Sequence, residues 1–197
     1  MKHIILIAVT ICLALLPAAG ARAQTAATMV DSVYFTGVSA DGTVACGNSS
    51  EGLYEACRWD AVGGLVRLGR SSVEGNGRGG GIPGISADGN AVSSSIISSD
   101  TLVTMGLWTK GIGWVEMMPP PPTDGGNMDE AYGSAWGITG DGLGVVGLYW
   151  RPEAVWPDGS AHACIAFQGG GVVDLGSRAG SGRANGADYD GDVVVGW

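Results

Sequence analysis

The chain repeats one short segment four times, each copy placing a glycine, an Asp-Gly pair and an apolar run in the same order. The copies begin at Gly37, Gly84, Gly137 and Gly186, so their starts lie 47, 53 and 49 residues apart. A period of this length is typical of solenoids and propellers, in which stacked neighbours bury the faces that one unit alone would expose. The repeat therefore constrains the architecture much more tightly than the activity. The Asp-Gly pairs are Asp41-Gly42, Asp88-Gly89, Asp141-Gly142 and Asp190-Gly191.

Each unit is expected to contain four short strands. Asp-Gly between two apolar runs favours a tight hairpin, because glycine tolerates a positive φ and aspartate permits one. A strand with an aromatic residue, a glycine-rich turn and a last strand then follow, and no stretch keeps a helical period. The sequence thus predicts an all-β, propeller-like array of three four-stranded units and an incomplete fourth. The expected buried positions are Val44, Val92, Val145, Val146 and Val193 to Val195.

Residues 1–23 have the pattern of a secretory signal peptide. Lys2 precedes an apolar run from Ile4 to Leu16, and Ala21-Arg22-Ala23 forms a small-residue cleavage site before Gln24. The run is too short for a membrane span. We therefore expect an exported protein, either secreted, periplasmic or on the cell surface, with residues 24–197 as one β-repeat domain and no transmembrane segment after cleavage.

Cleavage makes the chain more acidic. Loss of Lys2 and Arg22 leaves 8 basic and 19 acidic residues, so the formal net charge changes from −9 to −11. Lys110 is then the only lysine. Such a surface argues against nucleic acid and anionic lipid as partners.

Three cysteines remain after cleavage: Cys46, Cys57 and Cys164. An oxidising compartment permits disulfides, and Cys46 and Cys57 flank one predicted hairpin, which makes them a candidate pair. Cys164 would then be a free thiol or take part in an intermolecular bridge. None of the cysteine spacings resembles a metal site.

The repeat resembles the HAF family of bacterial extracellular repeats, which is named after a His-Ala-Phe tripeptide. The resemblance rests on the Asp-Gly segments, on Gly-Gly-x-Val-Asp-Leu-Gly at 170–176 and on His162-Ala163, although Cys164 stands where phenylalanine is expected. It covers about residues 30–197, with a Pro/Gly-rich insertion at about 118–133 that contains Pro119 to Pro122. The resemblance implies a propeller-like exported protein and carries over no catalytic residue.

The fourth copy stops at Trp197, where its aromatic strand should follow. Three explanations stay open at this point. The chain is a piece of a longer array, or the last strand completes the first unit near Val33–Phe35, or the open edge pairs with another chain.

Few residues offer chemistry. Nucleophile-elbow, Walker, dinucleotide-binding and His-Glu-x-x-His motifs are absent from the sequence. His162 lies at the signature position of its repeat, and Cys164 would share its strand face, but a structural role accounts for both. We therefore expect no catalytic residue, cofactor or metal site.

Two further groups of residues are candidates for a ligand site. Asp188, Asp190 and Asp192 concentrate carboxylates that attract calcium in other proteins, yet their spacing is not that of an EF-hand and Asp190-Gly191 is already a repeat turn. Trp150 and Trp156 lie in a variable connection and are the candidate ligand-binding residues, as platforms on which a sugar stacks.

The leading hypothesis is an exported, non-enzymatic repeat scaffold that mediates surface or extracellular interactions. The alternative is a carbohydrate-binding or carbohydrate-active propeller, in which Trp150 or Trp156 stacks on sugar rings and carboxylates serve as acid and base. The partner in the first case would be an extracellular protein or glycan.

Overall fold

The structure, a computed structural model, describes residues 30, 32–49, 55–69, 81–97, 103–117, 133–150, 161–177 and 180–197. These residues contain fourteen strands and no helix. The predicted signal peptide, and the predicted insertion apart from Gly133, lie outside the described residues. Among the described residues no helix has the length and hydropathy needed to cross a bilayer.

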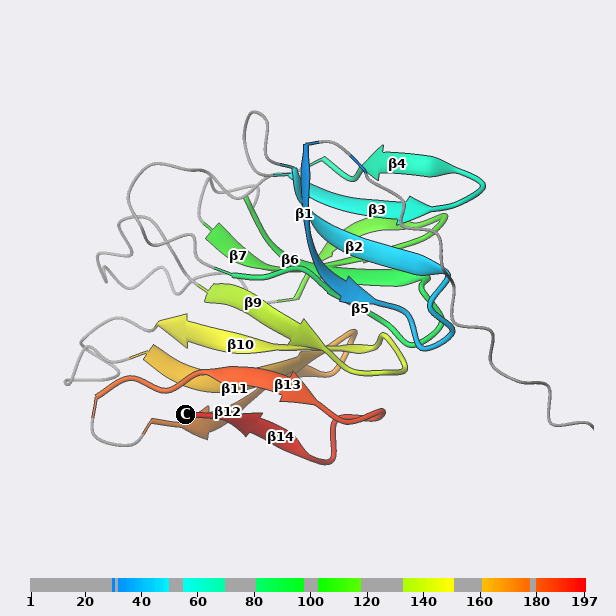
Figure 1. The fold of residues 1–197 in the computed structure, drawn as a ribbon. Coiled ribbons are helices and arrows are strands. Elements are labelled where there is room, and N and C mark those ends of the chain that lie inside the picture. The colour runs from blue at the N-terminus through cyan, green and yellow to red at the C-terminus, as the bar shows by residue number, and fades with distance from the viewer. Residues whose placement is uncertain are drawn as a thin grey trace, which may run out of the picture.

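The strands form three four-stranded antiparallel sheets and one two-stranded sheet, which follow one another along the chain. Figure 1 shows them stacked from the blue strands of the first unit to the red strands of the fourth. The all-β class and the array of three complete units with an incomplete fourth are therefore confirmed. The strands are β1 (Val33–Val38), β2 (Val44–Ser49), β3 (Ala56–Asp60) and β4 (Gly64–Arg67) in unit 1; β5 (Gly84–Ile85), β6 (Ala91–Ile97), β7 (Val103–Thr109) and β8 (Gly113–Glu116) in unit 2; β9 (Gly133–Ile138), β10 (Gly144–Trp150), β11 (Ala161–Phe167) and β12 (Gly171–Gly176) in unit 3; β13 (Ala184–Ala187) and β14 (Val194–Gly196) in unit 4.

The Asp-Gly segments are hairpin loops, as expected, but only their glycines have a positive φ. Gly42 has φ 73°, whereas Asp41 does not enter the left-handed region. The expectation that aspartate shares the positive φ was therefore wrong. Its role is instead to accept a hydrogen bond from the N–H of the residue two positions later, Thr43 in the first unit, which closes an Asx turn.

Backbone hydrogen bonds join each of these loops to the loop of the next unit. The N–H of Ala40 donates to the carbonyl of Ala87 at 2.9 Å, and the N–H of Ala87 donates to that of Gly140 at 2.8 Å. Gly140 continues the series with the carbonyl of Asp188 at 3.2 Å. The four loops thus form a ladder that fixes the position of each unit relative to its neighbour.

A β-bulge in the first strand explains the glycine that ends three of the four apolar runs. In unit 3 the pairing passes from Gly137 opposite Val146 to Ala135 opposite Gly147, so that Trp136 is the extra residue. The bulge brings the carbonyl of Ser134 to within 2.0 Å of where a β-carbon on Gly147 would lie. Gly47 and Gly196 face the same restriction. In unit 2 the first strand starts at Gly84, no bulge forms, and Ser94 takes this position.

The hydrophobic core lies between the sheets. Met105, Leu107 and Val145 belong to one buried cluster that joins units 2 and 3, and Val146, Ile165 and Ala184 join units 3 and 4. Most of the predicted core valines are buried: Val44, Val92, Val145 and Val146.

The fourth unit departs from the expected core. Val193 and Val195 are 57% and 61% exposed, so their predicted burial was wrong. In this structure β14 pairs with β13 and β1 pairs with β2. The last strand therefore does not complete the first unit here, and the valines that would face a following unit have no described residues over them.

The bulge predicts an unequal response to alanine at equivalent positions. We expect Gly147→Ala to lower the free energy of unfolding by about 1–3 kcal/mol, because the new β-carbon would collide with backbone that cannot move freely. Ser94→Ala removes only a weak hydroxyl contact, and should cost less than about 1 kcal/mol. Urea unfolding of both variants measures the difference, and equal costs would contradict the role of the bulge.

Candidate functional site

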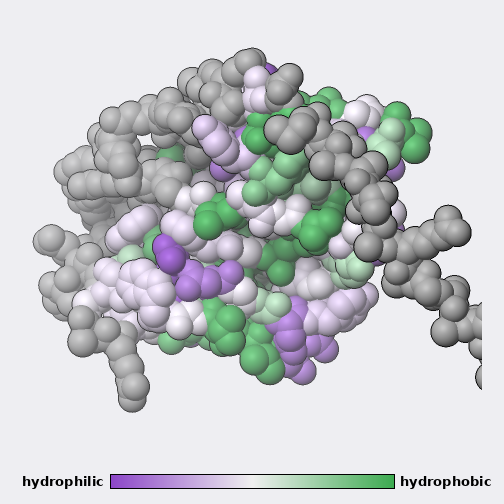
Figure 2. Space-filling view, in the orientation of Figure 1, coloured by the Kyte–Doolittle hydropathy of each residue, from purple (hydrophilic) through white to green (hydrophobic). Residues whose placement is uncertain are grey.

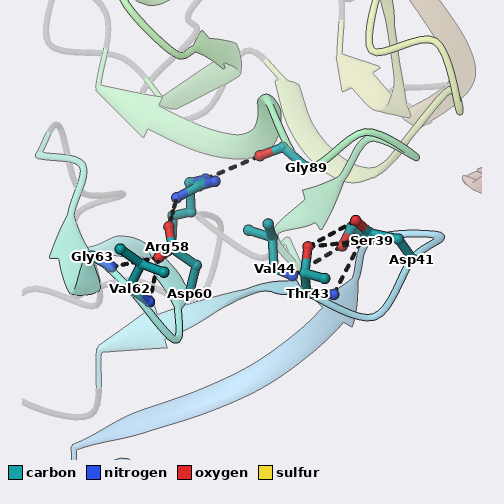
Figure 3. A network of polar contacts seen from close by, with 9 residues as sticks. All are labelled: Ser39, Asp41, Thr43, Val44, Arg58, Asp60, Val62, Gly63 and Gly89. Atoms are coloured by element: carbon teal, nitrogen blue, oxygen red, sulfur yellow. Dashed lines mark hydrogen bonds and ion pairs between the residues drawn. The ribbon is translucent and has the colours of Figure 1, made fainter.

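The Asp-Gly loops form a row of carboxylates, and in the first three units each of these carboxylates holds its own loop. Asp41 accepts hydrogen bonds from the hydroxyl of Ser39 at 2.7 Å and from the N–H of Thr43 at 3.0 Å, and Ser39 in turn accepts from the N–H of Val44 (Figure 3). Asp88 and Asp141 have the same two kinds of partner. These groups are therefore structural caps, as the sequence indicated.

Arg58 is the one buried cation in the described residues, and it links the first two units. Its side chain is 9% exposed. The guanidinium donates from Nε to the carbonyl of Gly89 at 3.0 Å and from Nη1 to Asp60 at 2.6 Å (Figure 3). Asp60 also accepts from the N–H groups of Val62 and Gly63. Arg58 thus clamps the second loop onto the first sheet.

These hydrogen bonds lower the pKa of several carboxyl groups. The N–H of Gly63 and the Arg58 side chain lower the pKa of Asp60 to about 2. The hydroxyl of Ser39, followed by Thr43, lowers the pKa of Asp41, and the hydroxyl of Ser86 lowers that of Asp88. All three stay ionised at neutral pH, so none is suited to act as a general acid there.

His162 and Cys164 do not form a catalytic pair. His162 Nδ1 lies 3.0 Å from Asp174 Oδ1, and Asp174 also accepts from the N–H of Gly176. Cys164 is fully buried beside the sulfur of Met105, and burial raises the pKa of its thiol. A neutral, inaccessible thiol is a poor nucleophile, so the structural role expected for both residues fits this geometry.

The proposed disulfide between Cys46 and Cys57 is not formed. All three described cysteines are free and buried. Cys46 lies opposite Arg58, and Cys57 lies opposite Gly47. Because neighbouring residues of a strand point to opposite faces, the two thiols lie on opposite faces of the sheet and cannot bond.

The acidic segment of the fourth unit is another loop cap. Asp188 replaces the Ser or Thr of the other units, and its carboxylate accepts from the N–H groups of Gly191 at 3.1 Å and Val193 at 3.0 Å. No group of three His, Cys, Asp or Glu side chains is arranged for a metal ion anywhere in the described ranges.

The two residues predicted to bind a ligand are only partly placed. Trp150 is half-buried at the end of β10, opposite Ala161. Trp156 lies outside the described residues. The sugar platform therefore stays a prediction.

A cation–π group that the sequence did not single out lies in the fourth unit. The guanidinium carbon of Arg183 is 3.6 Å from the ring centre of Trp136 and 5.1 Å from that of Trp197. Arg183 also donates to Asn185 at 2.6 Å. Its sequence neighbours give no sign of this contact, because Trp136 lies in the preceding unit.

One groove lies on unit 1, and another lies between units 3 and 4. The first, of about 500 Å³, is on the face of unit 1 that points away from unit 2, and Phe35, Val38 and Trp59 line it. The other, of about 380 Å³, runs along β14, with Leu175, Arg183 and Trp197 in its wall. Both are mainly apolar. Figure 2 shows hydrophobic residues in green beside hydrophilic ones in purple at the lower end of the view, where the fourth unit lies in Figure 1.

Solved structures support the propeller-like architecture. TolB from Acinetobacter baumannii superposes with a TM-score of 0.53 at 15% identity, over 80% of this chain and 37% of that one. A protein assigned as TolB from Agrobacterium tumefaciens gives 0.51 at 20% identity, over 83% and 53%. At these identities the likeness concerns the fold alone. The chain spans between about a third and about half of the length of these neighbours.

Sequence comparisons add no family assignment. No protein-family model matches the chain, and no curated protein sequence matches it significantly. The proposed function therefore rests on the geometry of the described residues.

The lowered pKa of Asp60 predicts a loss of stability in acid. Its folded pKa of about 2 lies below the ordinary value of 3.8, so its contribution is complete above about pH 5 and is lost as the pH falls toward 2. We expect Asp60→Asn to be less stable than the parent at pH 7, with a smaller further loss between pH 5 and 2. Unfolding midpoints measured across this range test the sign, and parallel curves would contradict it.

The register predicts the redox state of the thiols. We expect the exported chain, unfolded in guanidinium under non-reducing conditions, to react with about three equivalents of Ellman's reagent, one for each of the described cysteines. The folded chain should react much more slowly, because all three are buried and burial raises the pKa of Cys46 to about 11. About one reactive thiol in the unfolded chain would show that a disulfide had formed.

Proposed function

We propose that this chain is an exported, non-enzymatic repeat scaffold of the HAF kind, whose function is to present surfaces for interactions outside the cytoplasm. The proposal for export rests on the residues of the leader, and the proposal for a scaffold rests on the described residues. The similarity to TolB structures supports the fold only.

One observation carries the proposal most directly. Several polar and charged groups among the described residues hold the repeat together: Asp41, Asp88 and Asp141 cap loops, and Arg58 bridges units 1 and 2. His162 is bonded to Asp174, and the thiols are buried. Exposed apolar side chains lie on the outward faces of the first and fourth units, among them Val38 and Val195, and such surfaces suit binding rather than turnover.

The export half of the proposal predicts a defined mature protein. When the full chain is produced in a Gram-negative host, mass spectrometry of the exported fraction should find an N-terminus at Gln24. Leu13→Arg, which puts a charge into the apolar run, should keep the chain in the cytoplasm with its leader attached. Thr28→Arg, beyond the cleavage site, should be exported normally. Export of Leu13→Arg with an uncleaved leader would contradict the signal-peptide assignment.

The non-enzymatic half is tested with the mature chain against chromogenic glycosides, esters and phosphate esters. We expect no turnover above that of buffer. Turnover that is abolished by His162→Ala and kept by Gln168→Ala, an exposed polar residue in the loop after the same strand, would overturn the proposal and assign a catalytic role to His162.

A further inference from the structure

The interfaces of unit 1 with unit 2 and of unit 2 with unit 3 use equivalent positions on the second strand. Two positions of this strand, the first and the third of its apolar run, face the following unit. In unit 1 these are Val44 and Cys46, which are 7% and 0% exposed. The third position is also fully buried in units 2 and 3, at Ser93 and Val146.

The fourth unit has the same two positions, and no described residue lies over them. They are Val193 and Val195, which are 57% and 61% exposed. Val194 between them points back toward unit 3 and packs against its core cluster. The face of unit 4 that points away from unit 3 therefore repeats, without described residues over it, one half of the interface that the chain forms between units 1 and 2 and between units 2 and 3.

The following unit contributes the opposite half of the interface, through the residue that directly precedes its loop. In unit 2 this is Ile85, whose Cγ2 lies only 3.3 Å from where a β-carbon on Gly37 of unit 1 would be. In unit 3 it is Ile138, which lies in the same way against Gly84 of unit 2 at 3.1 Å. Each isoleucine thus fits over a glycine of the preceding sheet.

On the first unit this half has no described sheet over it. Val38, the equivalent of Ile85 and Ile138, is 62% exposed, and Phe35 beside it is 43% exposed. Both line the 500 Å³ groove on the outward face of unit 1.

The glycines of the Asp-Gly loops differ in the same way between unit 1 and the later units. A β-carbon on Gly89 would lie 2.7 Å from Val44, and one on Gly142 would lie 2.9 Å from Ala91, because each loop rests on the preceding unit. Gly42 has an almost identical φ and nothing within 4 Å. The first loop thus has the same conformation as the loops that dock on a preceding unit, but no described unit lies beneath it.

We propose that these two faces bind each other between two copies of this chain. Val38 of one copy lies over Gly186, beside Val195, of the other, as Ile85 lies over Gly37, beside Cys46, within the chain, and Gly42 rests on Val193 as Gly89 rests on Val44. The contact is heterologous, so each copy uses its first unit toward one side and its fourth toward the other. Two copies joined by two such contacts form a ring of about eight units, within the range of about four to eight blades known for propellers.

The inference goes beyond the proposed scaffold function and does not depend on export or on the absence of catalysis. The occupant is a second copy because the two open faces repeat an interface that the chain already makes, position by position. A partner of another kind would have to reproduce an isoleucine-over-glycine fit and a loop-on-strand fit together.

Light scattering on the purified mature chain tests the proposal. At about 100 µM we expect twice the monomer mass, and Val195→Glu and Val38→Lys should each raise the dimer dissociation constant at least about tenfold, since each buries one charge against an apolar face. Val62→Lys and Ile112→Glu are matched controls, because these residues are 100% and 70% exposed in turns outside both faces. Both controls should remain dimeric.

Mixing the two interface variants makes the test specific. In a mixed dimer one contact pairs Lys at position 38 with Glu at position 195, and the other contact is unchanged. Dimers should therefore reappear when Val38→Lys and Val195→Glu are combined, although each variant alone is a monomer. Circular dichroism and melting curves show whether each variant keeps its fold.

Three results would overturn the proposal: a parent chain that is monomeric at this concentration, a dimer that neither substitution weakens in folded protein, or folded variants that stay monomeric when mixed. Export and turnover are measured separately, so failure of this proposal is distinguishable from failure of the proposed function.

Discussion

The stacking of each Asp-Gly loop on its neighbour is the constraint on which the structure depends. Hydrogen bonds between loops fix the order and spacing of the sheets, and a glycine without a side chain lets each loop rest on the preceding unit. The sheets can then differ in what fills the space between them. Position 58 is an arginine that binds the carbonyl of Gly89, whereas its equivalents in units 2 and 3 are the buried apolar residues Leu107 and Ile165. The loop geometry is thus preserved while the chemistry of the interface varies.

Much of the fold was predictable because its signals are local. An Asp-Gly pair between apolar runs specifies a hairpin, and its fourfold recurrence specifies the number of units. The β-bulge was harder to predict from the sequence than the hairpins. In the sequence the β-bulge leaves only a glycine at positions 47, 147 and 196. A carbonyl of the paired strand occupies the space that a side chain would need there. The exception, Ser94, becomes understandable only once the short β5 is seen.

The wrong disulfide and the wrong burial share a cause: each needed information from outside the local pattern. Pairing Cys46 with Cys57 required the strand register, which places the thiols on opposite faces. Burial of Val193 and Val195 was inferred from earlier copies, but burial of a repeat residue depends on the unit beside it. The contact of Arg183 with Trp136 crosses between units and leaves no trace in sequence spacing. At the candidate site, the structural role of the loop carboxylates was predictable, and the two open faces were not.

The open faces matter because a repeat unit in water usually has a polar face where no neighbour covers it. Here the outer residues of the first and fourth units are as apolar as those at the internal interfaces: Val38 and Phe35 on one side, Val193 and Val195 on the other. At these positions both faces thus have the composition of surfaces that are covered. Because the two faces correspond to the two halves of one kind of interface, the unit 1 face of one copy fits the unit 4 face of a second copy.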